Sequence, residues 1–387
     1  MNFKMKRVLS LILALCLLAG VFTFAACKKK GEEKPDEKTE SAVLIEKCGI
    51  IHEPEFGGVY IKKTIEEFDS LGVKYGDSVN VEFSNGYKLE GIPYYNGYYT
   101  KNGEPLLIAY PGYDYIKAAI NNGDDLFIVA GLTESDTATV TLAEAGKFAD
   151  IQKARDIHYE DDREKYESDE QFANFRSIAV STMKEGAVYR SASPCDNQHN
   201  RAPYVDRLMM KAEIEFILNL SDNEEKIEKY MAAEDFDSPY FEELYLSGSV
   251  KPIALNMNYS SQEFKEKIAS GLTAMAEHEG PYLVHCTEGK DRTGFVCMLL
   301  EALTGASCEE IENDYMLTYD NYYGIKAGDE RYDVIVENVL MPMIESMAGE
   351  GFDIKTADLS ACAERFLLDA GMSAETIAKL KANIAAQ

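Results

Sequence analysis

The sequence predicts an α/β domain with a central, mostly parallel sheet flanked by helices, preceded by a small β-rich domain. After residue 156, short apolar runs alternate with longer helix-like stretches, a pattern typical of parallel strands joined by helices. Residues 42–155 instead carry short β-type runs broken by Gly, Asn and Pro. The length of 387 residues, 46% of them hydrophobic, allows more than one core. We therefore place a domain boundary between residues 155 and 156.

The first 26 residues have the pattern of a secretory signal. A basic stretch at residues 4–7 precedes an apolar run at residues 8–24, and two alanines follow before Cys27. Residues 24–27 resemble the lipobox of bacterial lipoproteins, which implies cleavage before Cys27 and acylation of that cysteine. Phe24 departs from the more usual leucine. An uncleaved membrane anchor and a simple secretory signal cut elsewhere remain as alternatives, and each would still export the chain.

Residues 27–41 are expected to form a disordered tether, because they are charged and nearly free of apolar side chains. Removal of residues 1–26 deletes three positive charges and no negative ones, which takes the net charge from −28 to −31. This acidic balance argues against nucleic acid as a partner and against a broad basic face for anionic lipid. The acyl chain is then the expected membrane contact, on the outer face of the bacterial cytoplasmic membrane.

The β-rich domain at residues 42–155 contains two informative stretches. Asn85 and Gly86 follow the β-type run at residues 78–83, and this dipeptide is a strong hairpin signal. Residues 92–99 hold four tyrosines, which could form a binding surface or pack against a small barrel. Packing is the favoured interpretation.

In the domain at residues 156–387, charged stretches at 156–170 and 223–229 are interpreted as solvated helices or linkers. Apolar patterning predicts strands at 216–220, 252–256 and 282–285, and helices at 260–276, 295–303, 308–323 and 373–386.

Eight cysteines divide into distinct groups. Cys16 leaves with the signal, Cys27 is the lipidation candidate, and Cys286 must stay a free thiol for the chemistry described below. Five others remain, an odd number, so a disulfide such as Cys308 to Cys362 is permitted but a disulfide framework is not indicated. We expect mostly buried thiols.

One decapeptide indicates the chemistry. Residues 285–294 read His285, Cys286, Thr287, Glu288, Gly289, Lys290, Asp291, Arg292, Thr293 and Gly294. They lie between a predicted buried strand and a predicted buried helix that begins at Phe295, so we expect a loop from strand to helix. A short loop that enters a helix can aim consecutive backbone N–H groups at one phosphate.

The side chains in this loop suit phosphoryl transfer. Arg292 carries a planar fork that can bind two phosphoryl oxygens, and a helix N-terminus beside it favours the thiolate form of Cys286 as nucleophile. Gly289 and Gly294 permit the tight path. Asp291 is the nearest candidate for a proton donor. A metal site is not expected, because no second pair of Cys or His ligands lies near His285 and Cys286.

The decapeptide is similar to the signature of cysteine-dependent tyrosine phosphatases, in the bacterial branch that carries Gly-Lys-Asp-Arg-Thr-Gly. Residues 172–176 and 188–194 resemble the Asn-Phe-Arg and Tyr-Arg-Ser segments that open this catalytic domain. The resemblance covers residues 170–387 and implies a tyrosine-phosphatase-like fold without cofactor or metal.

The resemblance also implies roles for the loop residues. Cys286 would form a phosphocysteine, Arg292 would bind phosphate, and Asp291 would be the general acid. Lys290 would contact substrate, and Thr293 would support the thiolate by a hydrogen bond. The phosphate-binding loop would comprise Thr287, Glu288, Gly289, Lys290, Asp291 and Arg292, with His285 and Gly294 in supporting positions.

Two positions depart from the family pattern. Asn219 stands where the branch commonly has the aspartate of an Asp-Leu-Arg motif, and an amide cannot donate a proton as an acid. This leaves Asp291, or another carboxylate such as Asp222, as the general acid. The pair Thr287 and Glu288 places a carboxylate in the loop, which disfavours highly charged substrates.

Four further residues are expected to support the loop or its pocket. Arg176 and Arg190 would order the loop through ion pairs, while Tyr322 and Tyr323 could wall the pocket. His199 is interpreted as structural.

These features support hydrolysis of phosphate monoesters through a phosphocysteine, most consistently by a protein-tyrosine phosphatase. The alternatives are a phosphoinositide or inositol phosphate phosphatase and a noncatalytic phosphopeptide-binding module, against which the intact Cys286 and Arg292 argue. The expected partners are a phosphorylated protein or phospholipid substrate and the membrane, through the N-terminal lipid anchor.

Overall fold

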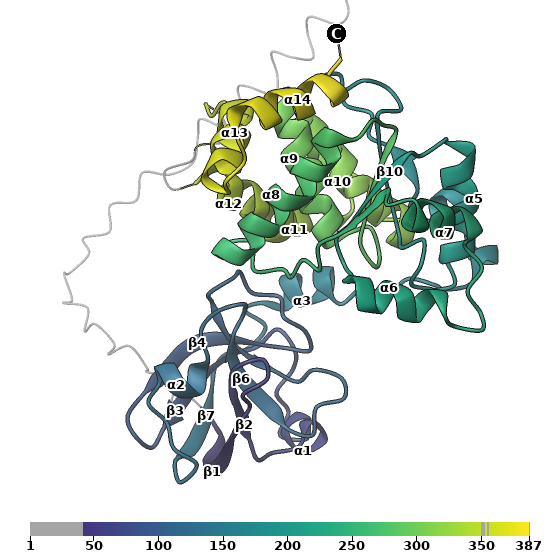
Figure 1. The fold of residues 1–387 in the computed structure, drawn as a ribbon. Coiled ribbons are helices and arrows are strands. Elements are labelled where there is room, and N and C mark those ends of the chain that lie inside the picture. Colours follow the sequence, from purple (N-terminus) through teal and green to yellow (C-terminus); the bar gives the residue numbers. More distant parts are fainter. Residues whose placement is uncertain (1–41, 350–352, 354–355, 387) are drawn as a thin grey trace, which may run out of the picture. The chain divides into compact units, whose positions relative to one another are not determined.

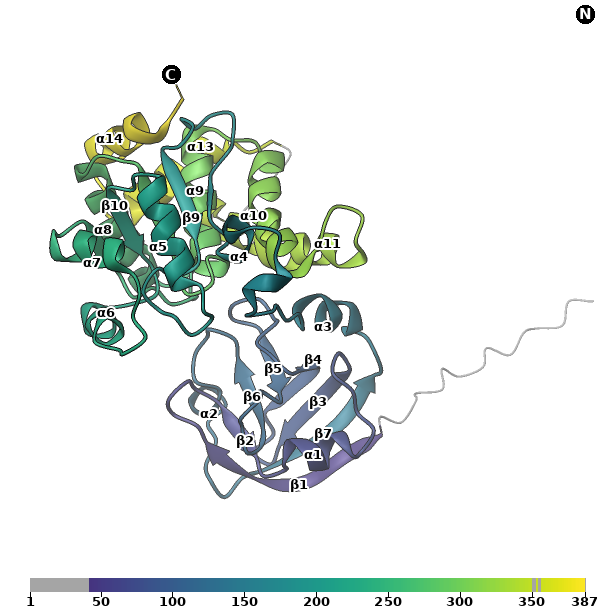
Figure 2. The ribbon, with the colours of Figure 1, turned by 90° about the vertical axis from the view of Figure 1, so that its right-hand side faces the viewer.

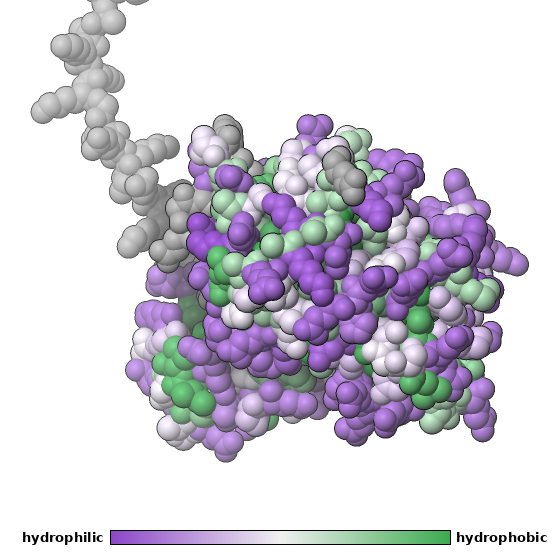
Figure 3. Space-filling model, turned by 45° about the horizontal axis from the view of Figure 1, so that its top comes forward, coloured by the Kyte–Doolittle hydropathy of each residue, from purple (hydrophilic) through white to green (hydrophobic). Residues whose placement is uncertain are grey.

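The computed structural model describes residues 42–349, 353 and 356–386, and residues 41–387 form one compact unit. The predicted signal peptide, the tether and Cys27 lie outside the described residues. No helix in the described ranges is long and apolar enough to cross a membrane. The face in Figure 3 is covered mostly by hydrophilic side chains, with apolar ones scattered among them.

The β-rich part is a closed barrel in the strand order β1-β2-β6-β5-β4-β3-β7 (Figure 1). Its strands are β1 (Val43–His52), β2 (Val59–Ile61), β3 (Ser78–Phe83), β4 (Lys88–Tyr95), β5 (Pro105–Ile108), β6 (Ile116–Ile120) and β7 (Thr137–Glu144). All neighbouring strands pair antiparallel except β4 and β5. Closure leaves no free sheet edge.

Local sequence accounts for the β3–β4 hairpin. Gly86 has a φ of +93°, a conformation that glycine adopts without steric cost, and the two strands pair antiparallel on either side of it. Val79, Val81 and Phe83 alternate along β3 and fill the barrel core. The predicted hairpin at Asn85 and Gly86 is confirmed.

The barrel carries α1 (Ile65–Asp69) and α2 (Leu126–Val129), and α3 (Ala149–Arg155) follows its last strand. Phe148 and Ile151 pack against a small cluster of buried residues that includes Tyr95 and Ile108. Tyr94 and Tyr95 are fully buried, so the packing interpretation is correct for these two tyrosines.

The α/β part contains a five-stranded sheet in the order β11-β10-β12-β9-β8. The strands are β8 (Arg176–Ser177), β9 (Val188–Ser191), β10 (Phe216–Asn219), β11 (Val250–Pro252) and β12 (Tyr282–His285). Pairing is parallel throughout except for the edge strand β8, which runs antiparallel to β9. Since Asn219 and His285 are register partners, β10 and β12 end at the same edge.

Helices cover both faces of this sheet (Figure 2). The helical elements are η1 (Arg163–Lys165), α4 (Asp169–Phe172), α5 (Ala202–Lys211), α6 (Glu224–Met231), α7 (Pro239–Leu246), α8 (Gln262–Glu277), α9 (Asp291–Thr304), α10 (Cys308–Tyr323), α11 (Glu330–Ile335), η2 (Val336–Leu340), α12 (Met341–Ala348), α13 (Leu359–Asp369) and α14 (Ala374–Ile384). Along β10, Phe216 and Leu218 pack on the side of α8 and α9, whereas Ile217 packs on the side of α5 and α7. Burial on both faces explains why the two central strands, β10 and β12, are largely apolar runs.

The limits of α10 follow from its sequence. Ser307 and Glu310 form a reciprocal capping box at the first turn, and Gly324 adopts the left-handed conformation just past the end. These signals lie within the helix and its neighbours, which is why the prediction of residues 308–323 is correct at both ends.

Three expectations need correction. Helix α9 begins at Asp291 rather than at Phe295, so the loop is shorter than predicted. The strand expected at residues 252–256 ends at Pro252, because β11 occupies residues 250–252. Cys308 and Cys362 are free thiols, so the permitted disulfide between them is not formed.

A buried ion cluster joins the sheet to α10. Asp314 Oδ2 lies 2.5 Å from Arg190 Nη1, and Asp314 Oδ1 lies 3.1 Å from Arg176 Nε. Burial opposes ionisation of Asp314, but the two guanidinium groups outweigh it and lower its pKa to about 2. The carboxylate is therefore charged at neutral pH.

Replacement of Asp314 by Asn should lower the free energy of unfolding by about 3 to 5 kcal/mol, because it leaves two buried guanidinium groups without their anion. Urea denaturation measures the change. Asp320→Asn is the matched control on the same helix, since its exposed pair with Lys326 should contribute less than about 1 kcal/mol. Equal losses in both variants would contradict the role of the cluster.

His285 at the end of β12 gives a pH dependence. Burial lowers the pKa of His285 from 6.5 to about 4. The negative charge of Asp222 acts in the opposite direction but is the smaller effect. The unfolded chain takes up this proton below about pH 6.5 and the folded chain resists it. Above pH 6.5, His285 is neutral in both the folded and the unfolded chain and does not lower the free energy of unfolding. As the pH falls from 6.5 to 4, the free energy of unfolding decreases, because the unfolded chain takes up the proton first.

We expect His285→Gln to flatten the loss of unfolding free energy between pH 6.5 and pH 4, by up to about 3 kcal/mol. Thermal or urea unfolding across that range tests it. His158→Gln, at an exposed histidine, should leave the wild-type slope unchanged. The assignment fails if the two variants follow the same pH curve.

Candidate active site

The Cys-x5-Arg segment follows the carboxyl end of β12. Strand β12 lies between β10 and β9 in the sheet. Strand β12 ends at His285, residues 286–290 form the loop, and Asp291 begins α9. Crevices at the carboxyl ends of parallel strands are common ligand sites. The apolar residues of α9 are almost all buried, so the helix, and with it the loop, is fixed to the core.

Three consecutive carbonyl groups of the loop are held by donors from outside it. These contacts are Ser193 N to Thr287 O at 3.1 Å, Tyr322 Oη to Glu288 O at 2.8 Å, Arg190 Nη2 to Gly289 O at 3.0 Å and Asn174 Nδ2 to Gly289 O at 3.2 Å. The ion pairs expected from Arg176 and Arg190 are made with Asp314 and not with the loop. Arg190 contacts the loop through its hydrogen bond to Gly289 O, and Arg176 contacts Asn174, which also donates to that oxygen.

The backbone N–H groups of the same loop remain free. Within the described part of the chain, the N–H groups of Thr287, Glu288, Gly289 and Lys290 have no hydrogen-bond acceptor. Since the carbonyl groups are tied to the surrounding structure, these donors are available on the other side of the loop. Consecutive free N–H groups at the start of a helix form a site for an anion.

Two glycines are required by close contacts. Gly289 has a φ of +67°, and a Cβ there would lie 2.2 Å from the carbonyl oxygen of Ser191. A Cβ on Gly294 would lie 2.5 Å from Cε2 of the Tyr315 ring. Both contacts are far inside van der Waals distance, so the loop and the first turn of α9 pack directly on their neighbours.

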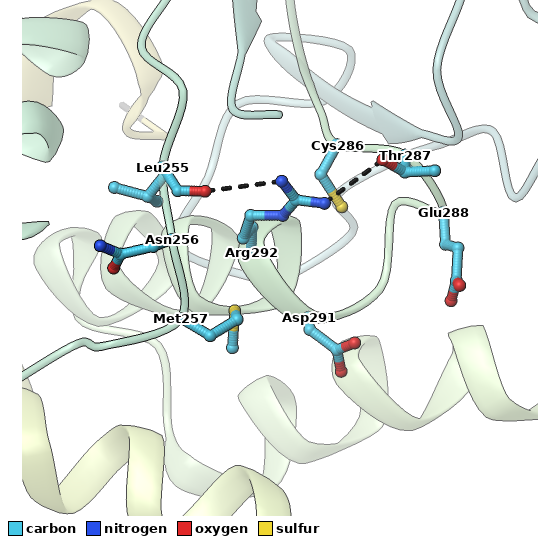
Figure 4. A pocket seen from close by; sticks show the side chains of 8 residues that line it. All are labelled: Leu255, Asn256, Met257, Cys286, Thr287, Glu288, Asp291 and Arg292. Atoms are coloured by element: carbon cyan, nitrogen blue, oxygen red, sulfur yellow. Dashed lines mark hydrogen bonds between the residues drawn. The ribbon is translucent and has the colours of Figure 1, made fainter. Parts of the chain in front are cut away.

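A cavity of about 190 Å³ lies over the loop (Figure 4). It is lined by Leu255, Asn256, Met257, Cys286, Thr287, Glu288, Asp291 and Arg292. Cys286 is only 2% exposed as a residue, yet it lines this cavity, so the thiol is not sealed in the core. The cavity is smaller than the roughly 300–1,000 Å³ typical of sites for drug-sized ligands.

Arg292 is oriented by neutral partners. Its Nη2 donates to Thr287 Oγ1 at 3.3 Å, and its Nη1 lies 3.5 Å from the carbonyl oxygen of Leu255. Across the described ranges, no carboxylate lies within ion-pair distance of Arg292. Its charge is therefore not neutralised by the protein, and Figure 4 shows the guanidinium beside Cys286.

Lys290 and Glu288 neutralise each other. Lys290 Nζ lies 3.0 Å from Glu288 Oε2, an ion pair without good hydrogen-bond alignment, and 3.8 Å from Asp291 Oδ2. Burial opposes the charge on Lys290, but the two carboxylates outweigh it and raise its pKa. Lys290 also donates to Tyr323 Oη at 3.3 Å and does not line the cavity, so its contact with substrate stays a prediction.

The two candidate acids differ in position. The Asp291 side chain is 37% exposed and lines the cavity. Asp222 is buried and accepts hydrogen bonds from Ser221 Oγ at 2.8 Å and Asn219 Nδ2 at 3.2 Å. The geometry therefore favours Asp291 as the proton donor.

His285 and Thr293 lie beneath the loop. His285 Nδ1 lies 3.3 Å from the carbonyl oxygen of Cys286, and its Nε2 has no partner in the described structure. The Thr293 hydroxyl is also buried without a partner among the residues described. Its hydrogen bond to the thiolate stays a prediction.

Tyr322 and Tyr323 do not line the cavity, so the expectation that they wall this pocket is wrong. They pack instead in an aromatic cluster whose other members, Tyr159 and Arg201, the sequence analysis did not single out. Tyr159 stacks on Tyr322 with ring centroids 5.0 Å apart, and the Arg201 guanidinium lies 4.6 Å above the Tyr159 ring. Residues 255–257, which line the cavity, were expected partly as strand. Tyr159 lies in a charged stretch that was interpreted as solvated. Its aromatic ring was the one local sign that this position could be buried. His199 bonds to Tyr159 Oη at 3.1 Å and to Asp161, consistent with a structural role.

The residues described contain no group of three or more His, Cys, Asp or Glu side chains arranged to hold a metal ion. The donors at the loop are suited to an anion.

Comparisons with known proteins agree with this arrangement. A tyrosine-protein phosphatase from Nostoc commune is 36% identical over 78 residues, which is 20% of this chain and 26% of that protein. The chain thus spans about a quarter of the length of this curated relative.

Two solved structures show limited likeness. The core catalytic domain of the PP-IP phosphatase SIW14 from S. cerevisiae, in complex with citrate, has a TM-score of 0.27 and 20% identity over 45% of this chain and 91% of that one. An uncharacterized conserved protein from Thermotoga maritima has a TM-score of 0.23 and 18% identity over 31% of this chain and 42% of that one. TM-scores this low carry no structural conclusion.

The tyrosine phosphatase family model matches residues 169–386, more than half of the chain and including the whole Cys-x5-Arg loop. The chain belongs to the tyrosine phosphatase family.

Proposed function

We propose that this protein hydrolyses phosphate monoesters through a phosphocysteine at Cys286, with phosphotyrosine in proteins as its substrate. The observation that carries the proposal is the set of free backbone N–H groups from Thr287 to Lys290, next to Cys286 and the unneutralised Arg292. These donors fit the three equatorial oxygens of a phosphoryl group during in-line displacement.

The reaction proceeds in two displacements. The Cys286 thiolate attacks phosphorus, the ester P–O bond breaks, and Asp291 donates its proton to the departing alcohol oxygen. Water then attacks the phosphocysteine, Asp291 takes a proton from it, and the S–P bond breaks to release phosphate and regenerate the thiolate. Each proton removed is returned within the cycle.

Most of the rate must come from the cradle and the acid. A lower thiol pKa raises the thiolate fraction, but it lowers intrinsic nucleophilicity by a similar factor, so the two effects nearly cancel. Preorganised donors around the transferred group supply the larger part, because they need no reorganisation during the reaction.

Charges near the loop support a protein substrate over a phosphoinositide. Glu288 neutralises Lys290, which leaves Arg292 as the cation that lines the phosphate cavity. A polyphosphorylated inositol would need several more cations. A phosphoinositide with few phosphates is the second candidate, because Arg292 alone could bind a single phosphate.

We also propose that the enzyme is exported and anchored through an acylated Cys27, on the sequence pattern of residues 1–27. Metabolic labelling with a fatty acid should mark the wild-type protein and not Cys27→Ala. The phosphorylated substrate would then be reached outside the cytoplasmic membrane.

Cys286→Ser should lower kcat/KM for p-nitrophenyl phosphate by at least about a thousandfold, because a hydroxyl does not ionise there. Steady-state kinetics with purified protein measure the loss. Cys308→Ser, at a half-buried thiol away from the cavity, is the control and should keep wild-type activity. Equal rates for the wild type and Cys286→Ser would refute thiol catalysis.

Asp291→Asn should slow alkyl phosphates by about 100-fold or more and slow p-nitrophenyl phosphate much less, since nitrophenolate leaves without a proton. The dependence of kcat/KM on leaving-group pKa distinguishes these effects, because kcat/KM reports the formation of the phosphocysteine and not its later hydrolysis. If all leaving groups slow equally, Asp291 is not the donor, and Asp222→Asn should then be tested in the same way.

A further inference from the structure

A second and larger cavity, of about 590 Å³, lies beside the phosphate cavity. Met257 and Asp291 line both, so the two spaces adjoin at the proposed general acid. The barrel contributes Tyr98, Tyr110 and Tyr113 to its lining, while α3 contributes Arg155. This volume is typical of a ligand site.

Asp291 lines both cavities, and this indicates which part of the substrate the larger cavity would bind. A general acid must lie within hydrogen-bond reach of the oxygen that leaves, so Asp291 marks the side from which the alcohol departs. Because Asp291 also lines the larger cavity, the group attached to that oxygen extends along it. This step rests on the proposed function.

Direct contacts hold the barrel beside the catalytic loop. Asn102 Nδ2 donates to the carbonyl oxygen of Met257 at 3.0 Å, within the segment that lines the phosphate cavity. Tyr98 and Tyr113 are joined through their hydroxyl groups at 3.1 Å, and Tyr110 packs against both rings. The result is a cluster of aromatic rings next to the catalytic acid.

Arg155 is a cation without a carboxylate partner. It is half-buried, lines the larger cavity, and lies 5.3 Å above the Tyr99 ring. Of the carboxylates in the described ranges, none lies within 4.0 Å of its guanidinium, whereas Lys101 in the same lining is 3.9 Å from Glu345. A partly desolvated guanidinium in a ligand cavity favours an anionic group on the ligand.

We propose that the barrel completes the active site: the larger cavity binds the residues that flank phosphotyrosine in a protein substrate, and Arg155 selects an acidic residue among them. The tyrosine cluster and Met343 suit apolar side chains. The barrel is then a specificity domain rather than a spacer.

The polar groups in the lining favour a peptide over a lipid headgroup. The side-chain nitrogens of Asn121 and Asn122 already donate within the protein, to Thr100 O at 2.6 Å and to Asn102 Oδ1 at 2.8 Å. Each of these amides keeps its oxygen and one further N–H, and this pair of an acceptor and a donor matches the N–H and C=O groups of a peptide backbone. A phosphoinositide would also need more than one unpaired cation.

The test compares two phosphotyrosine peptides, identical except for acidic or neutral flanking residues, with p-nitrophenyl phosphate as a substrate too small to fill the cavity. Wild-type kcat/KM should favour the acidic peptide about tenfold. Arg155→Gln should abolish this preference and change p-nitrophenyl phosphate turnover by less than twofold. Lys153→Gln, an exposed site on the same helix that pairs with Glu330, should keep the preference.

A second variant keeps the proposal testable if Arg155→Gln folds poorly. Tyr110 is 45% exposed, so Tyr110→Ala should fold, raise KM for both peptides severalfold and leave p-nitrophenyl phosphate unaffected. An acidic preference that survives Arg155→Gln, or is absent from the wild type, would overturn the subsite.

Two further outcomes distinguish a failure of the peptide subsite from a failure of the proposed phosphatase activity. Loss of turnover on a short-chain phosphatidylinositol phosphate in Arg155→Gln, with both peptides unchanged, would overturn the peptide assignment in favour of a lipid headgroup. Absence of p-nitrophenyl phosphate hydrolysis by the wild type would refute the proposed function itself, and the subsite with it.

Discussion

The site depends on how the carbonyl groups of the loop are held. Hydrogen bonds from residues outside the loop keep them turned away from its N–H groups. A backbone that gives its C=O groups to one side leaves its N–H groups for the other, and here the side of the C=O groups is occupied by Arg190, Asn174, Tyr322 and the backbone of Ser193. The anion site is thus built by residues that never touch the anion. Backbone N–H groups without an acceptor cost free energy, and the hydrogen bonds to the neighbouring carbonyl groups hold these N–H groups in place.

The buried charges serve the same arrangement. Arg190 can donate to the loop only if its guanidinium is held inside the protein, and Asp314 supplies the counter-charge that makes this burial tolerable. Helix α10 therefore contributes twice, through Asp314 near its middle and Tyr322 near its end. Stability and catalytic geometry are coupled along this helix.

The barrel changes how the catalytic pocket is interpreted. The cavity over the loop is small, and it adjoins the larger cavity at Met257 and Asp291. The lining of the larger cavity is shared between the catalytic part and a cluster of barrel tyrosines. The four tyrosines of residues 92–99 divide accordingly: Tyr94 and Tyr95 pack the barrel, Tyr99 packs against Tyr95 and Arg155, and Tyr98 lines the larger cavity.

The sequence alone determined the order of strand, loop and helix around Cys286, though not where the helix begins, as well as the β3–β4 hairpin and the ends of α10, because these features depend on residues adjacent in the chain. Tertiary structure decided what anchors the loop, which carboxylate lines the pocket, and the position of Arg155 beside it. The contacts that anchor the loop join residues 34 to 115 positions apart, and their free energies depend on burial and distance, which no local pattern records.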